Sequence, residues 1–105
     1  SDLTIILINL ETQTRNILDS ITRLLKLMEL YNYQEEAAQY EYEKGLKDLE
    51  LGQITDQDVS ELLINLENTR LSKQQNIINT NMTYLQLANL QGVDLLNHPV
   101  LRNVE

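Results

Sequence analysis

The 105-residue chain has no cysteine, no tryptophan and no phenylalanine, and it has only one proline and three glycines. Without cysteine the chain can form neither disulfides nor thiol intermediates. Sandwiches and barrels need many turns, so a chain this poor in turn-forming and aromatic residues favours long helices. No run of about 18 apolar residues is present, and no segment therefore predicts a helix that spans a bilayer.

Histidine and cysteine, which often carry catalysis or bind metals, are also scarce. His98 is the only histidine, and it stands before Pro99, where we expect a helix to have ended. With no cysteine or second histidine beside it, it cannot form a catalytic triad or a metal cluster. Asp56-Gln57-Asp58 begins like a calcium loop but lacks the glycine and the distal ligands of that motif. We therefore expect no enzymatic activity, no cofactor and no metal.

Acidic residues are concentrated in one part of the chain. The net charge is −8, and the segment from Glu29 to Glu61 holds ten acidic residues against Lys44 and Lys47. The other residues carry six acidic and six basic side chains, which cancel. This segment would repel a phosphate backbone, so nucleic acid is not an expected partner.

The first part of the chain repeats apolar residues at alternating spacings of four and three. These positions are Leu3, Leu7, Leu10, Thr14, Ile17, Ile21, Leu24, Met28, Tyr31, Glu35, Ala38, Tyr42, Gly45 and Leu49, of which only Thr14, Glu35 and Gly45 are not apolar. Such a repeat is typical of a coiled-coil seam and predicts a helix over about 3–51. The β-branched opening, residues 3–8, would also suit a strand.

The second part predicts another helix, over about 56–96, with a more polar seam. The seam is Val59, Leu63, Leu66, Arg70, Lys73, Ile77, Thr80, Tyr84 and Leu87, and a row at every seventh residue, Ile64, Leu71, Ile78 and Leu85, runs beside it. Two apolar rows predict contact with more than one neighbouring helix. The many Asn, Gln and Thr side chains between them predict hydrogen-bonded seams. Gly92 and Asn97-His98-Pro99 are expected to end this helix, which leaves a short tail, 97–105.

The connection between the two helices is short. Gly52 can adopt the left-handed conformation that ends a helix. Thr55 and Asp58 have the spacing of a capping box, which begins a helix. A turn over 52–55 sends the second helix back antiparallel to the first. The predicted fold is all-α: one long antiparallel helical hairpin, or coiled coil, formed by residues 1–105.

Two helices cannot cover all of this apolar surface. We therefore interpret the chain as a fragment of a larger protein, and expect the isolated fragment to self-associate as a dimer that forms a four-helix bundle.

Three segments carry a resemblance to a known family. They are Tyr40-Glu41-Tyr42-Glu43-Lys44-Gly45, the stretch from Gly52 to Leu62, and the stretch from Tyr84 to Leu95. Together they resemble the repeat of the TolC-like outer-membrane efflux and secretion channel family: a long helix, a glycine-marked tip with an Asp-Val-x-x-Leu-like start, and a Tyr-x-x-Leu-x-x-Leu-x-Gly close.

This resemblance implies a trimeric parent in a Gram-negative bacterium, with this hairpin in a periplasmic α-helical barrel below an outer-membrane β-barrel. It also implies that the hairpin tip docks a periplasmic adaptor protein. The matching positions here are Leu51, Gly52, Gln53, Ile54 and Thr55. One hairpin cannot build such a barrel, so pore formation by this chain alone is not expected.

Other interpretations stay open. An adaptor protein of the same machinery has its own α-hairpin, but the basic, serine-flanked tip of adaptors is missing around Asp48. A stand-alone coiled-coil hairpin that serves oligomerisation or as a scaffold is a further alternative. At the tip, Leu51 and Ile54 either form an apolar docking surface within an acidic rim or fold back to cover the end of the coiled coil.

Overall fold

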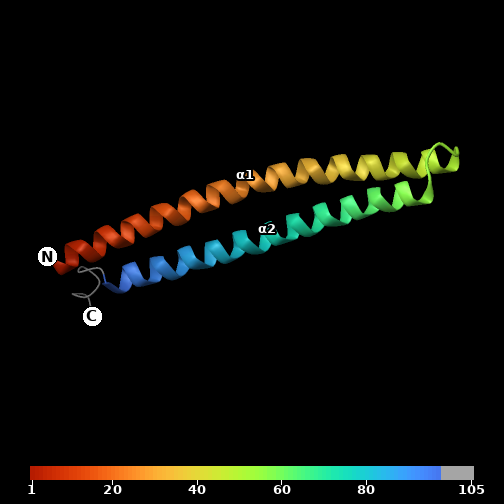
Figure 1. Cartoon of the computed structure of the whole chain (residues 1–105). Helices are drawn as coiled ribbons and strands as arrows, with labels where there is room; N and C mark the ends of the chain where they lie inside the picture. The colour runs from red at the N-terminus through yellow and green to blue at the C-terminus, as the bar shows by residue number, and fades with distance from the viewer. Residues whose placement is uncertain (98–105) are drawn as a thin grey trace. The chain divides into compact units, whose positions relative to one another are not determined.

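The computed structural model describes residues 1–97 and contains two helices (Figure 1). Helix α1 spans Asp2–Glu50 and helix α2 spans Asp56–Asn97, and no strand occurs within residues 1–97. The predicted all-α antiparallel helical hairpin is thereby confirmed. The helix bounds differ from the predicted ones by one residue or less. His98 and Pro99 lie outside the described residues.

The β-branched opening of the chain is helical. Residues 3–8 belong to α1, so the strand alternative for them is wrong. Ser1 supports the start of this helix, because its hydroxyl accepts a hydrogen bond from the Thr4 N–H at 3.2 Å and its carbonyl accepts one from the Ile5 N–H at 3.1 Å. The strand preference of single residues depends on their context, and here these residues form the first turns of a long helix.

Gly92 does not end the second helix. It lies inside α2, which continues to Asn97. Among the described residues only Gly52 has a positive φ, so Gly92 does not adopt the left-handed conformation of a helix end. A glycine lowers helix stability only modestly, and here the helix continues through it.

The chain divides into two compact units. The tip unit is Lys26–Ile78, and the terminal unit combines residues 1–25 with residues 79–105, of which 79–97 are described. Within each unit a part of α1 lies beside an antiparallel part of α2 (Figure 1). In the tip unit the most buried apolar side chains are Ala38 and Leu66, and in the terminal unit they are Ile21 and Leu24.

The inner face of α1 follows the predicted seam. Every seam position from Leu10 to Leu49 is buried or half-buried. Leu3 and Leu7 are exposed, at 40% and 36%. The 4-3 spacing therefore identified the residues of α1 that face α2 from Leu10 onward.

The inner face of α2 differs from the predicted seam at three positions. Leu63, Ile77 and Tyr84 are exposed, at 38%, 38% and 46%. The neighbouring residues Leu62, Asn76 and Thr83 take the inner positions: Asn76 is 4% exposed, and the other two are half-buried. At two of the three pairs the predicted seam takes the apolar residue, Ile77 or Tyr84, whereas the structure places the polar neighbour inside, and at the third pair it exchanges one leucine for the next.

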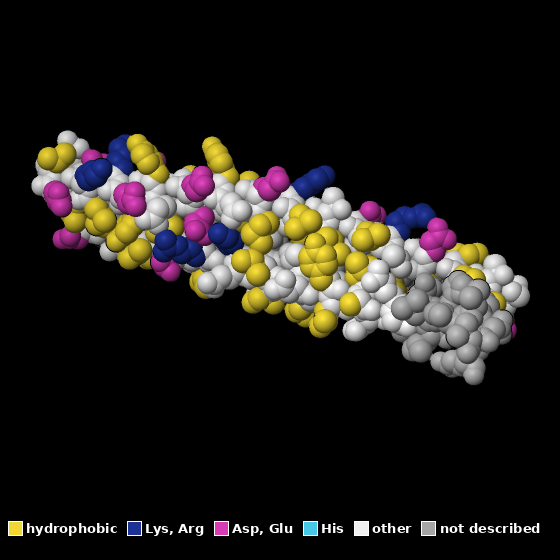
Figure 2. Space-filling view, turned by 180° about the vertical axis from the view of Figure 1, so that it is seen from behind, with side chains coloured by type: hydrophobic (Ala, Val, Ile, Leu, Met, Phe, Trp, Pro, Cys, Tyr) yellow, Lys and Arg dark blue, Asp and Glu magenta, His cyan; other side chains and the backbone are white. Residues whose placement is uncertain are grey.

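This orientation leaves apolar side chains on the outside of α2. In the tip unit they are Leu63, Ile64, Leu71, Ile77 and Ile78, which we call the outer α2 face. Ile64, Leu71 and Ile78 are 58%, 61% and 50% exposed. Hydrophobic side chains reach the surface along the lower edge of the view in Figure 2, on the side of α2.

Candidate functional site

The hairpin tip begins with a Schellman motif at the end of α1. Gly52 has a φ of 74°, and its N–H donates to the Leu49 carbonyl at 3.0 Å. The Gln53 N–H donates to the Asp48 carbonyl at 2.8 Å. These two bonds satisfy carbonyls that would otherwise lack partners at the helix end, and the left-handed residue lets the chain turn back.

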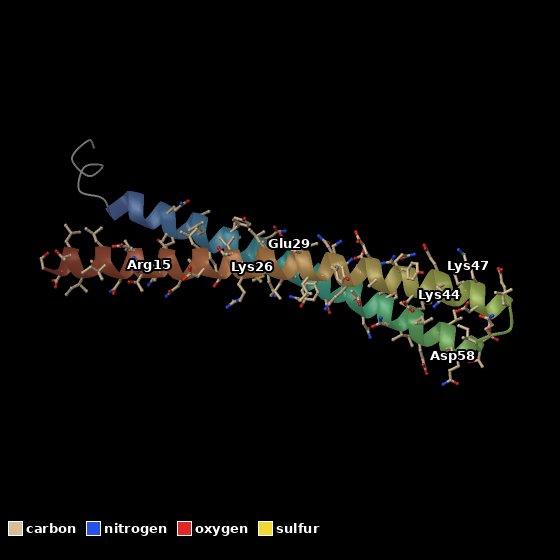
Figure 3. All side chains as sticks on the ribbon, turned by 90° about the horizontal axis from the view of Figure 1, so that it is seen from above. Arg15, Lys26, Glu29, Lys44, Lys47 and Asp58 are labelled. Carbon is tan, nitrogen blue, oxygen red and sulfur yellow. The ribbon has the colours of Figure 1, made fainter. Side chains whose placement is uncertain are left out.

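The other side of the tip is a capping box, as predicted. The Thr55 hydroxyl accepts a hydrogen bond from the Asp58 N–H at 3.1 Å, and the Asp58 carboxylate accepts one from the Thr55 N–H at 2.9 Å. Figure 3 places Asp58 at the start of α2, next to the turn. Hydrogen bonds from the backbone N–H of Thr55, and then from its side chain, lower the pKa of Asp58 below its ordinary value of 3.8. The two ends of the turn are therefore both fixed by local hydrogen bonds.

The two apolar residues of the tip lie differently. Leu51 is 71% exposed. Ile54 is half-buried, and its Cδ1 atom lies 3.6 Å from the point where a Cβ on Gly45 would be. Ile54 therefore folds back against the end of the coiled coil. Leu51 does not, and its side chain points into solvent. Gly52, Gln53 and Thr55 are exposed.

Gly45 determines how closely the helices approach beside the tip. It is buried, and a Cβ added to it would lie only 2.5 Å from Cδ1 of Leu62. The missing side chain therefore provides the space that Leu62 of α2 fills. This explains why Leu62, and not Leu63, lies on the inner face at this level.

An open groove of about 430 Å³ lies over this contact. Its apolar floor is formed by Gly45, Ile54 and Leu62. The polar residues that line it are Glu41, Lys44, Asp48, Asp58, Glu61 and Asn65. The groove thus combines a small apolar floor with a rim in which acidic side chains outnumber the single lysine.

Polar side chains connect α1 and α2 in the middle of the tip unit. Arg70 donates to the Gln39 Oε1 atom at 2.8 Å, and Lys73 Nζ lies 3.4 Å from Glu35 Oε2. Both side chains of the Lys73–Glu35 pair are 29% exposed. The seam spacing had placed Glu35, Arg70 and Lys73 correctly, but the pairing of these residues was not predicted.

The described residues hold neither a metal-binding cluster nor a helix that could cross a membrane. No group of three or more His, Cys, Asp or Glu side chains that could hold a metal ion occurs among them. Neither helix, over its described part, is apolar enough over a sufficient length to span a bilayer.

Comparison of the chain with protein-family models, with curated proteins and with solved structures found no match. The resemblance to the TolC-like channels therefore depends on the sequence segments quoted above.

Proposed function

We propose that this hairpin is an assembly element, which acts by packing its outer α2 face against helices of another polypeptide. The observation that carries the proposal is the exposure of five large apolar side chains on one side of α2, while polar residues such as Asn76 occupy the inside. Large apolar side chains exposed together on one side of a helix can mark an interaction site. Burying it would contribute roughly 25 cal/mol per Å² of apolar surface.

Sedimentation of the purified chain tests this proposal for the case in which the other polypeptide is a second copy of the chain. The wild-type chain should associate at micromolar concentration, and the triple variant Ile64→Gln, Leu71→Gln, Ile78→Gln should sediment as a folded monomer. The matched control is Tyr33→Gln with Tyr40→Gln, because these tyrosines are 72% and 64% exposed on α1. The control should associate like the wild type. A wild-type chain that remains a well-folded monomer at high micromolar concentration would refute self-association.

A narrower candidate is a periplasmic hairpin of an outer-membrane efflux or secretion channel, whose tip docks an adaptor protein. The resemblance of the three quoted segments supports it, together with the exposed Leu51 and the groove with acidic side chains near the tip. In such a parent the outer α2 face would pack against neighbouring hairpins of the α-barrel. The tip residues Leu51 to Thr55 would meet the adaptor.

The different positions of Leu51 and Ile54 give this candidate a sharp test in a full-length channel that carries the hairpin. Leu51→Ser should impair adaptor-dependent export and leave folding and trimer assembly intact, because Leu51 makes little contact within the hairpin. Ile54→Ser should lower the melting temperature, because Ile54 packs beside Gly45 and Leu62. Normal export by the Leu51→Ser channel would show that Leu51 at the tip does not take part in adaptor docking.

A further inference from the structure

We infer that the outer α2 face binds a second copy of this chain in the opposite direction, with Leu71 at the two-fold axis. The inference rests on the proposed assembly function and adds to it the partner and the direction. The spacing of the apolar residues and the charges beside them both support it.

The apolar residues of the face are spaced symmetrically. Ile64 and Ile78 lie seven residues before and after Leu71, which is two helical turns in each direction. A two-fold axis through Leu71 therefore places Leu71 against its own copy, and Ile64 of one chain against Ile78 of the other. All three exposed side chains gain an apolar partner in a single isologous contact.

The charges beside the face favour the opposite direction over the same direction. α2 has no charged residue from Gln74 to Val93, whereas Glu61 and Glu67 lie on the other side of Leu71. Antiparallel pairing places Glu67 of one chain opposite Gln75 of the other. Parallel pairing would place Glu67 against Glu67 and would bring together the two segments Glu29–Glu61, each of which carries a net charge of −8. Like charges brought together raise the free energy of the complex.

Basic side chains near the face do not reverse this preference. Arg70 is engaged with Gln39 at 2.8 Å and with Glu67 at 3.1 Å, and Lys73 lies beside Glu35. Both cations therefore already have partners within the hairpin. Because Arg70 already pairs with Glu67, the repulsion in a parallel pair comes mainly from the acidic excess of the two Glu29–Glu61 segments.

Single-cysteine variants test the inference, because the natural chain contains no cysteine. Ile64→Cys and Ile78→Cys chains are purified separately, treated with a short bismaleimide crosslinker alone or after mixing, and separated by size. The mixture should give crosslinked dimers, and each variant alone should give none. The reason is that an antiparallel contact joins position 64 only to position 78. Leu71→Cys alone should crosslink, and Tyr33→Cys, which is exposed on α1, should not.

The outcomes separate this inference from the proposed function. Crosslinking of Ile64→Cys with itself, and not with Ile78→Cys, would show a parallel pair. That result would overturn the inference, leave the assembly function standing and favour the channel candidate, in which neighbouring tips point the same way. Association without any crosslink at positions 64, 71 or 78 would place the contact on another face and also overturn the inference. A monomeric wild-type chain would overturn the inference and the self-association together.

Discussion

Thr55 and Asp58 show how much of the tip depends on single residues. Their two reciprocal hydrogen bonds satisfy N–H groups that have no partner within the helix. We predict that Thr55→Ala lowers the free energy of unfolding by about 1 kcal/mol, the usual effect of losing such a cap. Thr22→Ala, a change at an exposed position of α1 that removes a bond from a hydroxyl to its own helix, should cost less. Urea denaturation followed by circular dichroism measures both.

The lowered pKa of Asp58 predicts a dependence on pH. The carboxylate form is favoured in the folded chain, so its contribution is fully present above the ordinary pKa of 3.8 and is lost as the pH falls through the lower folded value. The difference in melting temperature between the wild type and Asp58→Asn should therefore be largest at neutral pH and shrink below about pH 4. A difference that grows on acidification would contradict the capping role of the charge.

The absence of a side chain at Gly45 also shapes the hairpin. Gly45→Ala gains helix propensity of about 0.8–1.0 kcal/mol, and it forces the end of the Leu62 side chain to move, which costs of order 0.5–1.5 kcal/mol. We expect these effects to nearly cancel. Gly45→Leu cannot be accommodated by a rotamer change, and should destabilise the hairpin by about 1–3 kcal/mol. Equal stability of the leucine variant and the wild type would show that the helices separate here without cost.

At the scale of the helices, three contacts define the register of α1 against α2, and two of them are polar. Glu35 with Lys73, Gln39 with Arg70, and Gly45 with Leu62 lie nearly symmetrically about residue 54, as an antiparallel hairpin with its turn there requires. Apolar contacts tolerate sliding, whereas a hydrogen-bonded or charged pair is satisfied only in one register.

A charge exchange tests this role of the Glu35–Lys73 pair. Glu35→Lys should destabilise the hairpin, because it places two lysines together, and Glu35→Lys with Lys73→Glu should recover most of the loss. The coupling energy of the cycle should be about 0.5–1 kcal/mol, since the pair is partly exposed. Glu36→Lys makes the same charge change at an exposed position and should cost little. A coupling energy of zero would show that the Glu35–Lys73 pair does not help to fix the register of the two helices.

At the scale of the whole molecule, the net charge opposes the association of two copies, whereas the exposed apolar surface favours it. Each chain carries −8, so the proposed association would bring like charges together while it buried the outer α2 face. Salt shortens the Debye length from about 10 Å at 0.1 M to about 3 Å at 1 M. We therefore predict that the dimer dissociation constant falls as sodium chloride is raised, as sedimentation equilibrium would measure. A dissociation constant that rises with salt would mean that ionic attraction, and not apolar burial, holds the copies together.

The sequence by itself determined the two helices, their antiparallel direction and the turn between them. These features depend on neighbours in the chain: the 4-3 spacing of α1, the left-handed Gly52 and the capping box of Thr55 and Asp58. Their interactions are complete within a few residues, so a local pattern predicts them without knowledge of the partner helix.

Only the tertiary structure decided which side of α2 faces α1. Leu62 and Leu63, or Asn76 and Ile77, are adjacent in the sequence, and both members of each pair fit a helical spacing. Their side chains point about 100° apart on the helix, so the choice between them depends on the surface that α1 presents. Gly45 leaves space for Leu62, and Gln39 and Glu35 offer partners to Arg70 and Lys73, so the side of α2 that carries these residues turns inward. The apolar outer α2 face is the consequence, because a helix that buries one side must expose the other.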